Sequence, residues 1–183
     1  DVEDILRTIR DLIRRVDEKS RKTLEENRRA IEEVLRRSDE TLRRNKKLIE
    51  DVEEEVRRTV KDEKLLREVK RRLEELLKEN KEMADRTREK LERLLRENER
   101  VVKETKRTLK EILDRAEEAA RVERREFMET VLRKIKEDIE RLEERNREVH
   151  EKSREEIRKL EEENEEVHRK SRKEIDEIRK ELK

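Results

Sequence analysis

This 183-residue chain contains no glycine, proline, cysteine, tryptophan or tyrosine, and only one phenylalanine. Glycine readily adopts the positive φ angles of tight turns, and proline interrupts helices. Their absence therefore disfavours both tight hairpins and breaks within helices. The lack of cysteine excludes a disulfide framework. A single aromatic ring cannot form a platform on which nucleic-acid bases stack. These absences favour long, uninterrupted helices.

Charged residues make up 61% of the sequence, yet 56 Lys and Arg side chains against 55 Asp and Glu leave a net charge of +1. The two signs are interspersed, as on solvated helix faces. A nucleic-acid-binding protein is expected to present a basic face of one sign, and we find none in the sequence. No apolar run approaches the roughly 20 residues that span a bilayer, and no signal-peptide segment is evident. We therefore expect no nucleic-acid or membrane partner, no natural compartment, and a soluble cytoplasmic product on recombinant expression.

Apolar residues recur at helical spacing in three stripes, each about the width of the face that a helix buries in a bundle. The stripes run from Val2 to Val60, from Leu65 to Ala120 and from Phe127 to Leu182. They predict an all-α protein with helices at about 2–60, 63–122 and 126–183 in a single domain over 1–183. One alternative starts a helix at Ser38, where Ser-Asp-Glu is a good capping sequence.

Uncharged polar residues lie inside these apolar stripes and repeat every 18 residues in each predicted helix. Because 18 residues make about five full turns of a helix with about 3.6 residues per turn, each copy returns to the same face of its helix. One set of copies comprises Ser20, Thr23, Asn27, Asn98, Thr105, Asn146, His150 and Ser153. The other set comprises Ser38, Thr41, Asn45, Asn80, Thr87, Asn164, His168 and Ser171.

The repeat also predicts how the helices pair. If consecutive helices run antiparallel, facing residue numbers must have a constant sum, and the polar blocks give 125 for the first pair and 251 for the second. The turns then fall near 62–63 and 125–126, where Asp62 is a plausible N-cap for the second helix. The predicted fold is an elongated, nearly straight up-down-up antiparallel three-helix bundle, because an 18-residue period imposes no left-handed supercoil.

Folding in this way collects the polar residues into two layers flanked by Ile, Leu and Val. A buried polar group without a partner costs about 1–3 kcal/mol, so the members of a layer must satisfy one another. A misregistered layer would bury unsatisfied groups, and the layers would therefore select one register. The alternative is that the Ser, Thr and Asn residues are partly exposed at the boundary of the core, and their recurrence on all three helices argues against it.

The only histidines, His150 and His168, fall one in each layer. One interpretation makes each of them a neutral network member that donates from one ring nitrogen and accepts at the other. The alternative interpretation is a pH switch. Burial disfavours the imidazolium, so stability would fall as the pH drops through and below the ordinary pKa of about 6.5.

The same histidines are poor candidates for a metal or catalytic site. Their separation of 18 helical residues corresponds to about 27 Å, and a single His among Ser, Thr and Asn suits zinc poorly. Each has a serine at i+3, Ser153 or Ser171, which superficially suggests an activated nucleophile. However, no carboxylate in the stripe orients the ring and no loop offers an oxyanion hole. We expect no enzyme activity, no metal and no cofactor.

Three motifs, with their 18-residue copies, resemble the cores of de novo designed, parametrically generated helical bundles with built-in hydrogen-bond networks: Ser20-x2-Thr23-x3-Asn27, Asn80-x6-Thr87 and Asn146-x3-His150-x2-Ser153. The resemblance covers the whole chain and includes the missing Gly and Pro and the Glu/Lys/Arg surface. It implies a structural scaffold that has no natural biochemical activity and requires no partner. We expect a monomer, with a homo-oligomer as the alternative.

Some designed bundles of this kind disassemble at low pH through buried histidine networks, and His150 and His168 match such positions. The resemblance therefore implies an alternative function, a pH-responsive helical module or assembly that protonation of these two residues destabilises. The chain departs from the strongly switching designs in having only two histidines.

Overall fold

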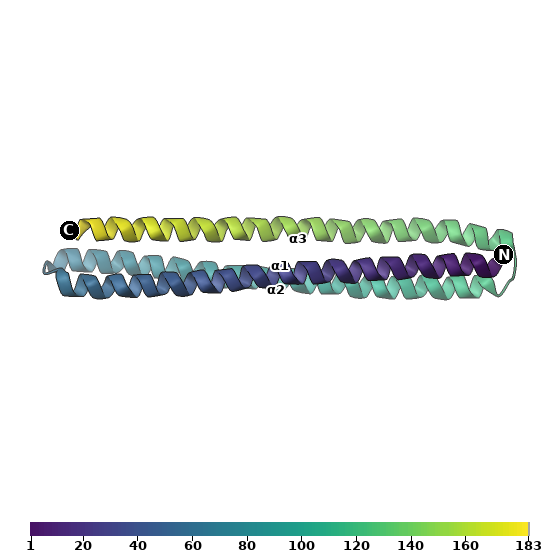
Figure 1. Cartoon of the computed structure of the whole chain (residues 1–183), viewed down its shortest axis with the longest axis horizontal. Coiled ribbons are helices and arrows are strands. Elements are labelled where there is room, and N and C mark those ends of the chain that lie inside the picture. The colour runs from purple at the N-terminus through teal and green to yellow at the C-terminus, as the bar shows by residue number, and fades with distance from the viewer. Residues whose placement is uncertain (183) are drawn as a thin grey trace. The chain divides into compact units, whose positions relative to one another are not determined.

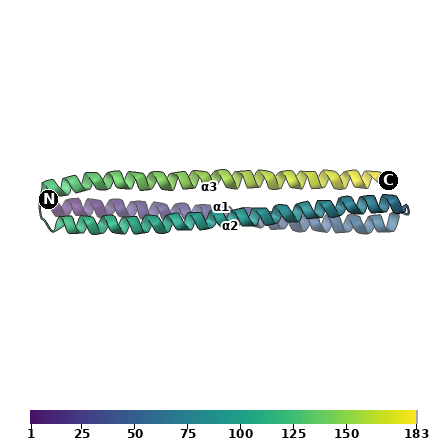
Figure 2. The same cartoon turned by 180° about the vertical axis from the view of Figure 1, so that it is seen from behind.

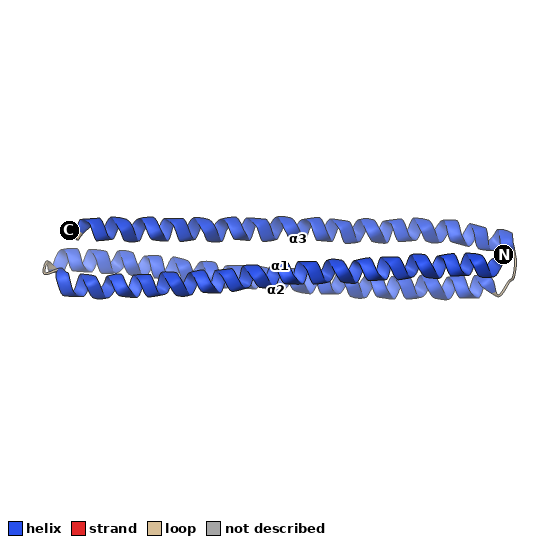
Figure 3. Ribbon diagram, viewed as in Figure 1, coloured by secondary structure: helices blue, strands red, loops and turns tan. Residues whose placement is uncertain are grey.

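The computed structural model describes residues 1–182, and helix is the only regular secondary structure within them (Figure 3). α1 spans Val2–Thr59, α2 spans Glu63–Ala120 and α3 spans Arg125–Glu181. Figure 1 follows the chain from α1 in purple and blue to α3 in green and yellow, and Figure 2 shows the same helices from behind. The prediction of an all-α protein whose three helices pack in a bundle is confirmed.

Short turns at 60–62 and 121–124 separate the helices. Asp62 caps α2, because its Oδ1 accepts a hydrogen bond from the backbone N–H of Lys64 at 3.0 Å. α2 ends at Ala120 rather than at the expected 122, because the N–H groups of 121–123 bond to carbonyls three residues back and tighten the chain. Glu123 then takes a φ of 56°, a left-handed conformation that glycine would adopt without steric cost. α1 continues through Ser38, so the alternative helix start there is wrong.

The chain forms two compact units, and each unit takes one segment from every helix. The first unit consists of Asp1–Arg29 and Leu94–Glu155. The second consists of Ala30–Arg93 and the part of α3 that follows Glu155.

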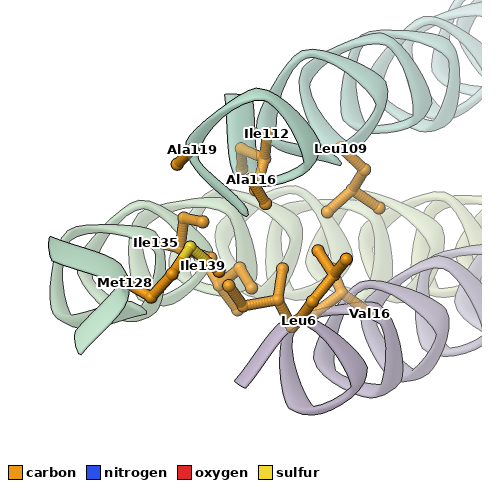
Figure 4. Close-up of a cluster of buried hydrophobic side chains, with 10 residues drawn as sticks. Leu6, Val16, Leu109, Ile112, Ala116, Ala119, Met128, Ile135 and Ile139 are labelled. Atoms are coloured by element: carbon orange, nitrogen blue, oxygen red, sulfur yellow. The ribbon is translucent and has the colours of Figure 1, made fainter. Parts of the chain in front are cut away.

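In the first unit, α1 runs antiparallel to α2 and parallel to α3. Asn27 bonds to Asn98 and Asn98 to Ser153, and these residue numbers have the predicted sums of 125 and 251. The apolar core of this unit comprises Leu6, Ile9, Val16, Leu109, Ile112, Ala116, Ala119, Met128, Ile135 and Ile139. Figure 4 labels all of these residues except Ile9. The periodic stripes therefore converge as the sequence predicts.

The second unit repeats this arrangement with different residues. Asn45 bonds to Asn80 and Asn80 to Ser171, which again gives sums of 125 and 251. Its apolar core comprises Ile49, Val52, Val56, Val69, Leu73, Leu76, Ile175 and Ile178. At its surface Arg72 of α2 forms ion pairs with Glu174 and Glu181 of α3, both at 2.8 Å.

Candidate functional site in the polar layers

The sixteen predicted polar residues gather into one layer in each unit. We call these the Asn27 layer, which holds the first of the two sets of copies defined above, and the Asn45 layer, which holds the second. Ten of the side chains are buried: Ser20, Asn27, Ser38, Asn45, Asn80, Thr87, Asn98, Thr105, Ser153 and Ser171. The other six are half-buried: Thr23, Thr41, Asn146, His150, Asn164 and His168.

Asn98 of α2 connects all three helices in the Asn27 layer. Its Nδ2 donates to the backbone oxygen of Leu94 at 2.8 Å and to Ser153 Oγ of α3 at 2.9 Å. Its Oδ1 accepts from Asn27 Nδ2 of α1 at 2.7 Å. Ser153 Oγ in turn donates a hydrogen bond to the backbone oxygen of Val149 at 2.7 Å. Both hydrogens and the oxygen of this buried amide therefore have partners within the protein.

A backbone carbonyl fixes the direction of hydrogen bonding through the layer. The Leu94 carbonyl can only accept, so the nitrogen of the Asn98 amide must face it and the oxygen must face Asn27. Asn27 then donates through Nδ2, which leaves its Oδ1 as the acceptor that lies 3.1 Å from His150 Nδ1. The neutral imidazole of His150 therefore carries its hydrogen on Nδ1.

Asn146 organises a second branch of the Asn27 layer. Its Nδ2 donates to Thr105 Oγ1 at 3.0 Å and to the backbone oxygen of Leu142 at 2.8 Å, while its Oδ1 accepts from Ser20 Oγ at 3.1 Å. Thr23 makes no hydrogen bond within residues 1–182 and instead lines a cavity of about 200 Å³ beside this branch. Seven of the eight predicted members of the layer are thus joined by hydrogen bonds.

The Asn45 layer repeats these bonds closely. Asn80 Nδ2 donates to the backbone oxygen of Leu76 at 2.8 Å and to Ser171 Oγ at 2.9 Å, and Asn80 Oδ1 accepts from Asn45 at 2.7 Å. His168 Nδ1 lies 3.2 Å from Asn45 Oδ1. Asn164 donates to Thr87 Oγ1 at 3.0 Å and to the backbone oxygen of Leu160 at 2.7 Å. The same argument as in the Asn27 layer places the hydrogen of neutral His168 on Nδ1.

Two members of the Asn45 layer stay outside its hydrogen-bonded set. Ser38 Oγ is buried without a partner, although its copy Ser20 donates to Asn146. Nothing in the neighbouring sequence explains this difference. Thr41, like Thr23, makes no hydrogen bond in the described part of the chain and lines a cavity of about 200 Å³.

The two histidines are half-buried, which corrects the expectation that they would be buried. Each ring reaches its layer through Nδ1 alone and otherwise lies along a cavity between α1 and α3. The charged residues lining the cavity at His150 are Lys19, Glu143 and Arg147. Those lining the cavity at His168 are Arg37, Glu40, Arg44, Glu161 and Glu165. The rim of each layer is therefore polar and charged rather than apolar.

The surroundings of His168 disfavour its charged form. Burial lowers the pKa of His168 below its ordinary value of 6.5, and the positive charges of Arg172 and Arg44 lower it further. Arg44 is itself paired with Glu40 at 3.0 Å. The folded protein therefore binds a proton at His168 less readily than the unfolded chain does.

The polar layers bring together hydroxyl, amide and imidazole groups without carboxylates. Within residues 1–182, no three His, Asp or Glu side chains gather closely enough to hold a metal ion. The described helices also include none with an apolar stretch long enough to cross a lipid bilayer. No protein family, curated protein or solved structure matches this chain.

Sequence reasoning missed a basic groove between α1 and α2 of the first unit. The groove has a volume of about 730 Å³, and its charged lining consists of Arg10, Arg14, Asp17, Lys103, Lys106, Arg107 and Lys110. Its signal is present in the sequence, because the four α2 cations have i, i+3, i+4 and i+7 spacing and so share one helix face. The even mixing of charges over the whole chain conceals this local excess, which the search for a basic face of one sign did not find.

Proposed function

We propose that this chain is a designed structural scaffold, a monomeric helical bundle without enzymatic activity whose helix register is specified by its two polar layers. The observation that carries the proposal is that the two layers repeat one another nearly bond for bond. Asn98 and Asn80 each donate to the carbonyl four residues earlier at 2.8 Å and to a serine of α3 at 2.9 Å. Such a repeat, in a chain without Gly or Pro and without a matching family, is typical of a generated sequence.

The layers supply conformational specificity rather than net stability. A satisfied buried hydrogen bond contributes only about 0.5–1.5 kcal/mol, whereas an unsatisfied donor or acceptor costs about 1–3 kcal/mol. A helix displaced by one turn would leave the amide of Asn98 without its partners on α1 and α3. The penalty for such an arrangement therefore exceeds the benefit of the correct one.

An apolar replacement of both polar layers tests this function. We expect it to keep or raise the guanidinium midpoint, because apolar packing replaces groups that must be desolvated, but to lose the single conformation. Backbone amide NMR should then show multiple sets of resonances, and light scattering should show masses besides the 22.8 kDa of one chain. The variant combines Asn27→Leu, Asn98→Leu, His150→Leu and Ser153→Ala with the equivalent changes in the Asn45 layer, Asn45→Leu, Asn80→Leu, His168→Leu and Ser171→Ala. The proposal fails if this variant keeps one set of resonances and one mass.

The lowered pKa of His168 favours a second candidate function, that of a pH-responsive helical module. The unfolded chain gains a proton on this residue near pH 6.5, whereas the folded protein gains it only at lower pH. The contribution of neutral His168 is therefore fully present above the unfolded pKa and is lost as the pH falls toward the folded pKa. The loss is limited, because the bonded Nδ1 already carries a hydrogen and the second proton adds at Nε2 without breaking the bond to Asn45.

The guanidinium midpoint measured at about pH 7.5 and about pH 5.2 tests the second candidate, because histidines gain charge between these values while most carboxylates do not. We expect a small decrease on acidification that His168→Asn abolishes. The double variant His150→Asn, His168→Asn contains no histidine. Any change in its midpoint between the two pH values comes from other titrating groups and is subtracted from the change in the parent protein. Equal midpoints of the parent protein at the two pH values would eliminate the second candidate and leave the scaffold as the function.

A further inference from the structure

The basic groove between α1 and α2 of the first unit carries a strong local excess of positive charge. Six cations line it, against the single carboxylate of Asp17, and Asp17 is already paired with Arg21. In a protein with a net charge of +1, this excess belongs to the groove and not to the molecule as a whole. The groove therefore attracts negative charge.

The cations that α2 contributes are available for binding. Lys103, Lys106, Arg107 and Lys110 are exposed and form no ion pair within residues 1–182. Like charges at i, i+3 and i+4 repel one another and destabilise a helix by about 0.2–0.5 kcal/mol for each pair. Negative charges placed along this face would relieve that repulsion. The cations of α1 are less available, because Arg10 pairs with Glu117 at 3.6 Å and Arg14 with Asp11 at 3.1 Å.

The groove is not a by-product of the 18-residue repeat. The copies of the four α2 cations, 18 positions earlier, are Asp85, Arg88, Glu89 and Glu92. Three of the four copies are acidic, so the polar layers repeat while the charge of this face is reversed. The positive groove is therefore a property of the first unit alone.

The floor of the groove is apolar, and this decides which anion fits. The apolar part of its lining comes from Ile13 of α1 and from Leu109 and Leu113 of α2. The lining of α2 extends over 103–113, about 15 Å or three helical turns. An aliphatic floor with positive edges is complementary to a helix that has an apolar stripe flanked by carboxylates. A nucleic acid would gain from the edges but nothing from the floor.

We propose that this groove binds an amphipathic helix whose apolar stripe is flanked on both sides by Asp and Glu. The stripe packs on the floor formed by Ile13, Leu109 and Leu113, and the carboxylates pair with the cations of α2 on one side and of α1 on the other. The bound helix would extend the three-helix packing of the first unit by a fourth helix.

The test measures fluorescence anisotropy of a labelled synthetic peptide of about 21 residues, with Leu at i, i+3, i+4 and i+7 positions and Glu on both flanks. We expect binding that weakens with salt, and a loss of at least about tenfold in affinity for the double variant Lys106→Glu, Lys110→Glu. The matched control Lys46→Glu, Lys47→Glu makes the same charge change on exposed α1 residues outside the groove and should leave the affinity unchanged. Circular dichroism verifies that both variants keep the parent helicity.

Three results would overturn the proposal. The first is no binding of the peptide at low salt. The second is an equal loss of affinity in the groove variant and in the control variant, which would mean that net charge alone attracts the peptide. The third is equal or tighter binding of a peptide with Ser in place of Leu, or of a short DNA duplex, which would identify a site for any polyanion rather than for an apolar helix.

Discussion

Replacing Asn98 with aspartate is expected to destabilise the protein by about 3–5 kcal/mol at neutral pH, the range found when a buried charge is left without compensation. The carboxylate has nearly the same shape as the amide but cannot donate to the Leu94 carbonyl or to Ser153 Oγ, which accept at 2.8 Å and 2.9 Å. Oxygen atoms would then face one another in a site where the side chain is only 4% exposed. The denaturant midpoint at about pH 7.5 measures the loss.

The pH dependence of this variant should have the opposite sign to that of the parent protein. Burial and the facing oxygens raise the folded-state pKa of an aspartate at position 98 above its unfolded value. Its destabilisation is complete above the folded pKa and is relieved as the pH falls through that value, because the protonated carboxyl can donate again. Asn80→Asp should behave alike in the Asn45 layer, whereas Thr8→Asp, at an exposed position, should change stability by at most about 0.5 kcal/mol. Parent-like stability of the Asn98 variant at both pH values would mean that the layer is open to water.

The second large effect is expected at Ile112, which is fully buried in the core of the first unit (Figure 4). Ile112→Ala should cost about 2–5 kcal/mol, and the upper part of this range is expected because the cavity cannot close. The neighbouring core positions on α2, Ala116 and Ala119, have only methyl groups and cannot reorient to fill the space. Guanidinium unfolding followed by circular dichroism measures the loss.

The matched control for Ile112 is Val122→Ala, in which an aliphatic side chain is shortened where it is 53% exposed. We expect a change within about 0.5 kcal/mol, since little area is transferred from water at that position. A similar, small effect at both positions would contradict the packing described for this core.

The pairing of the polar residues could be predicted because it rests on two regularities of the helix. The 18-residue period fixes which face Asn27, Asn45, Asn80 and Asn98 occupy, and antiparallel packing fixes which of them meet. The observed Asn27–Asn98 and Asn45–Asn80 bonds, both at 2.7 Å, follow from these regularities. Facing residues depend only on the period and on the antiparallel direction of the helices, so a single sequence suffices to identify them.

The depth of a side chain within its layer could not be predicted in this way. Periodicity assigns His150 and Asn27 to the same layer, yet the asparagine is fully buried and the histidine is half-buried. That difference depends on small rotations and separations of the helices, which leave the repeat unchanged. The unpartnered Ser38 Oγ is a difference of the same kind, since Thr41 and Asn45 follow Ser38 at the same spacing as Thr23 and Asn27 follow Ser20.

The basic groove escaped prediction because it combines residues from two helices. Arg10 and Arg14 of α1 lie far in sequence from Lys106 and Lys110 of α2, and each segment also contains acidic residues that lower its average charge. Only the pairing of the two helices places the cations on either side of one apolar floor. Combining the predicted pairing with the charge of each face would have identified it.

The near identity of the two polar layers allows one wrong alignment in which a single layer still forms its hydrogen bonds. A translation of α3 by 18 residues would place Asn164, His168 and Ser171 where Asn146, His150 and Ser153 now lie, and the same hydrogen bonds could form. The rest of the protein opposes this alignment, because Asn80 would lose Ser171, and Asn146 and Ser153 would take the places of Met128 and Ile135 in the apolar core of the first unit. Surface charges oppose it as well. Arg145 pairs with Glu104 at 2.7 Å, but its copy is Glu163, which would meet the same carboxylate with like charge. This exchange of sign adds charge repulsion to the cost of the translated pairing, and Glu163→Arg would remove that repulsion.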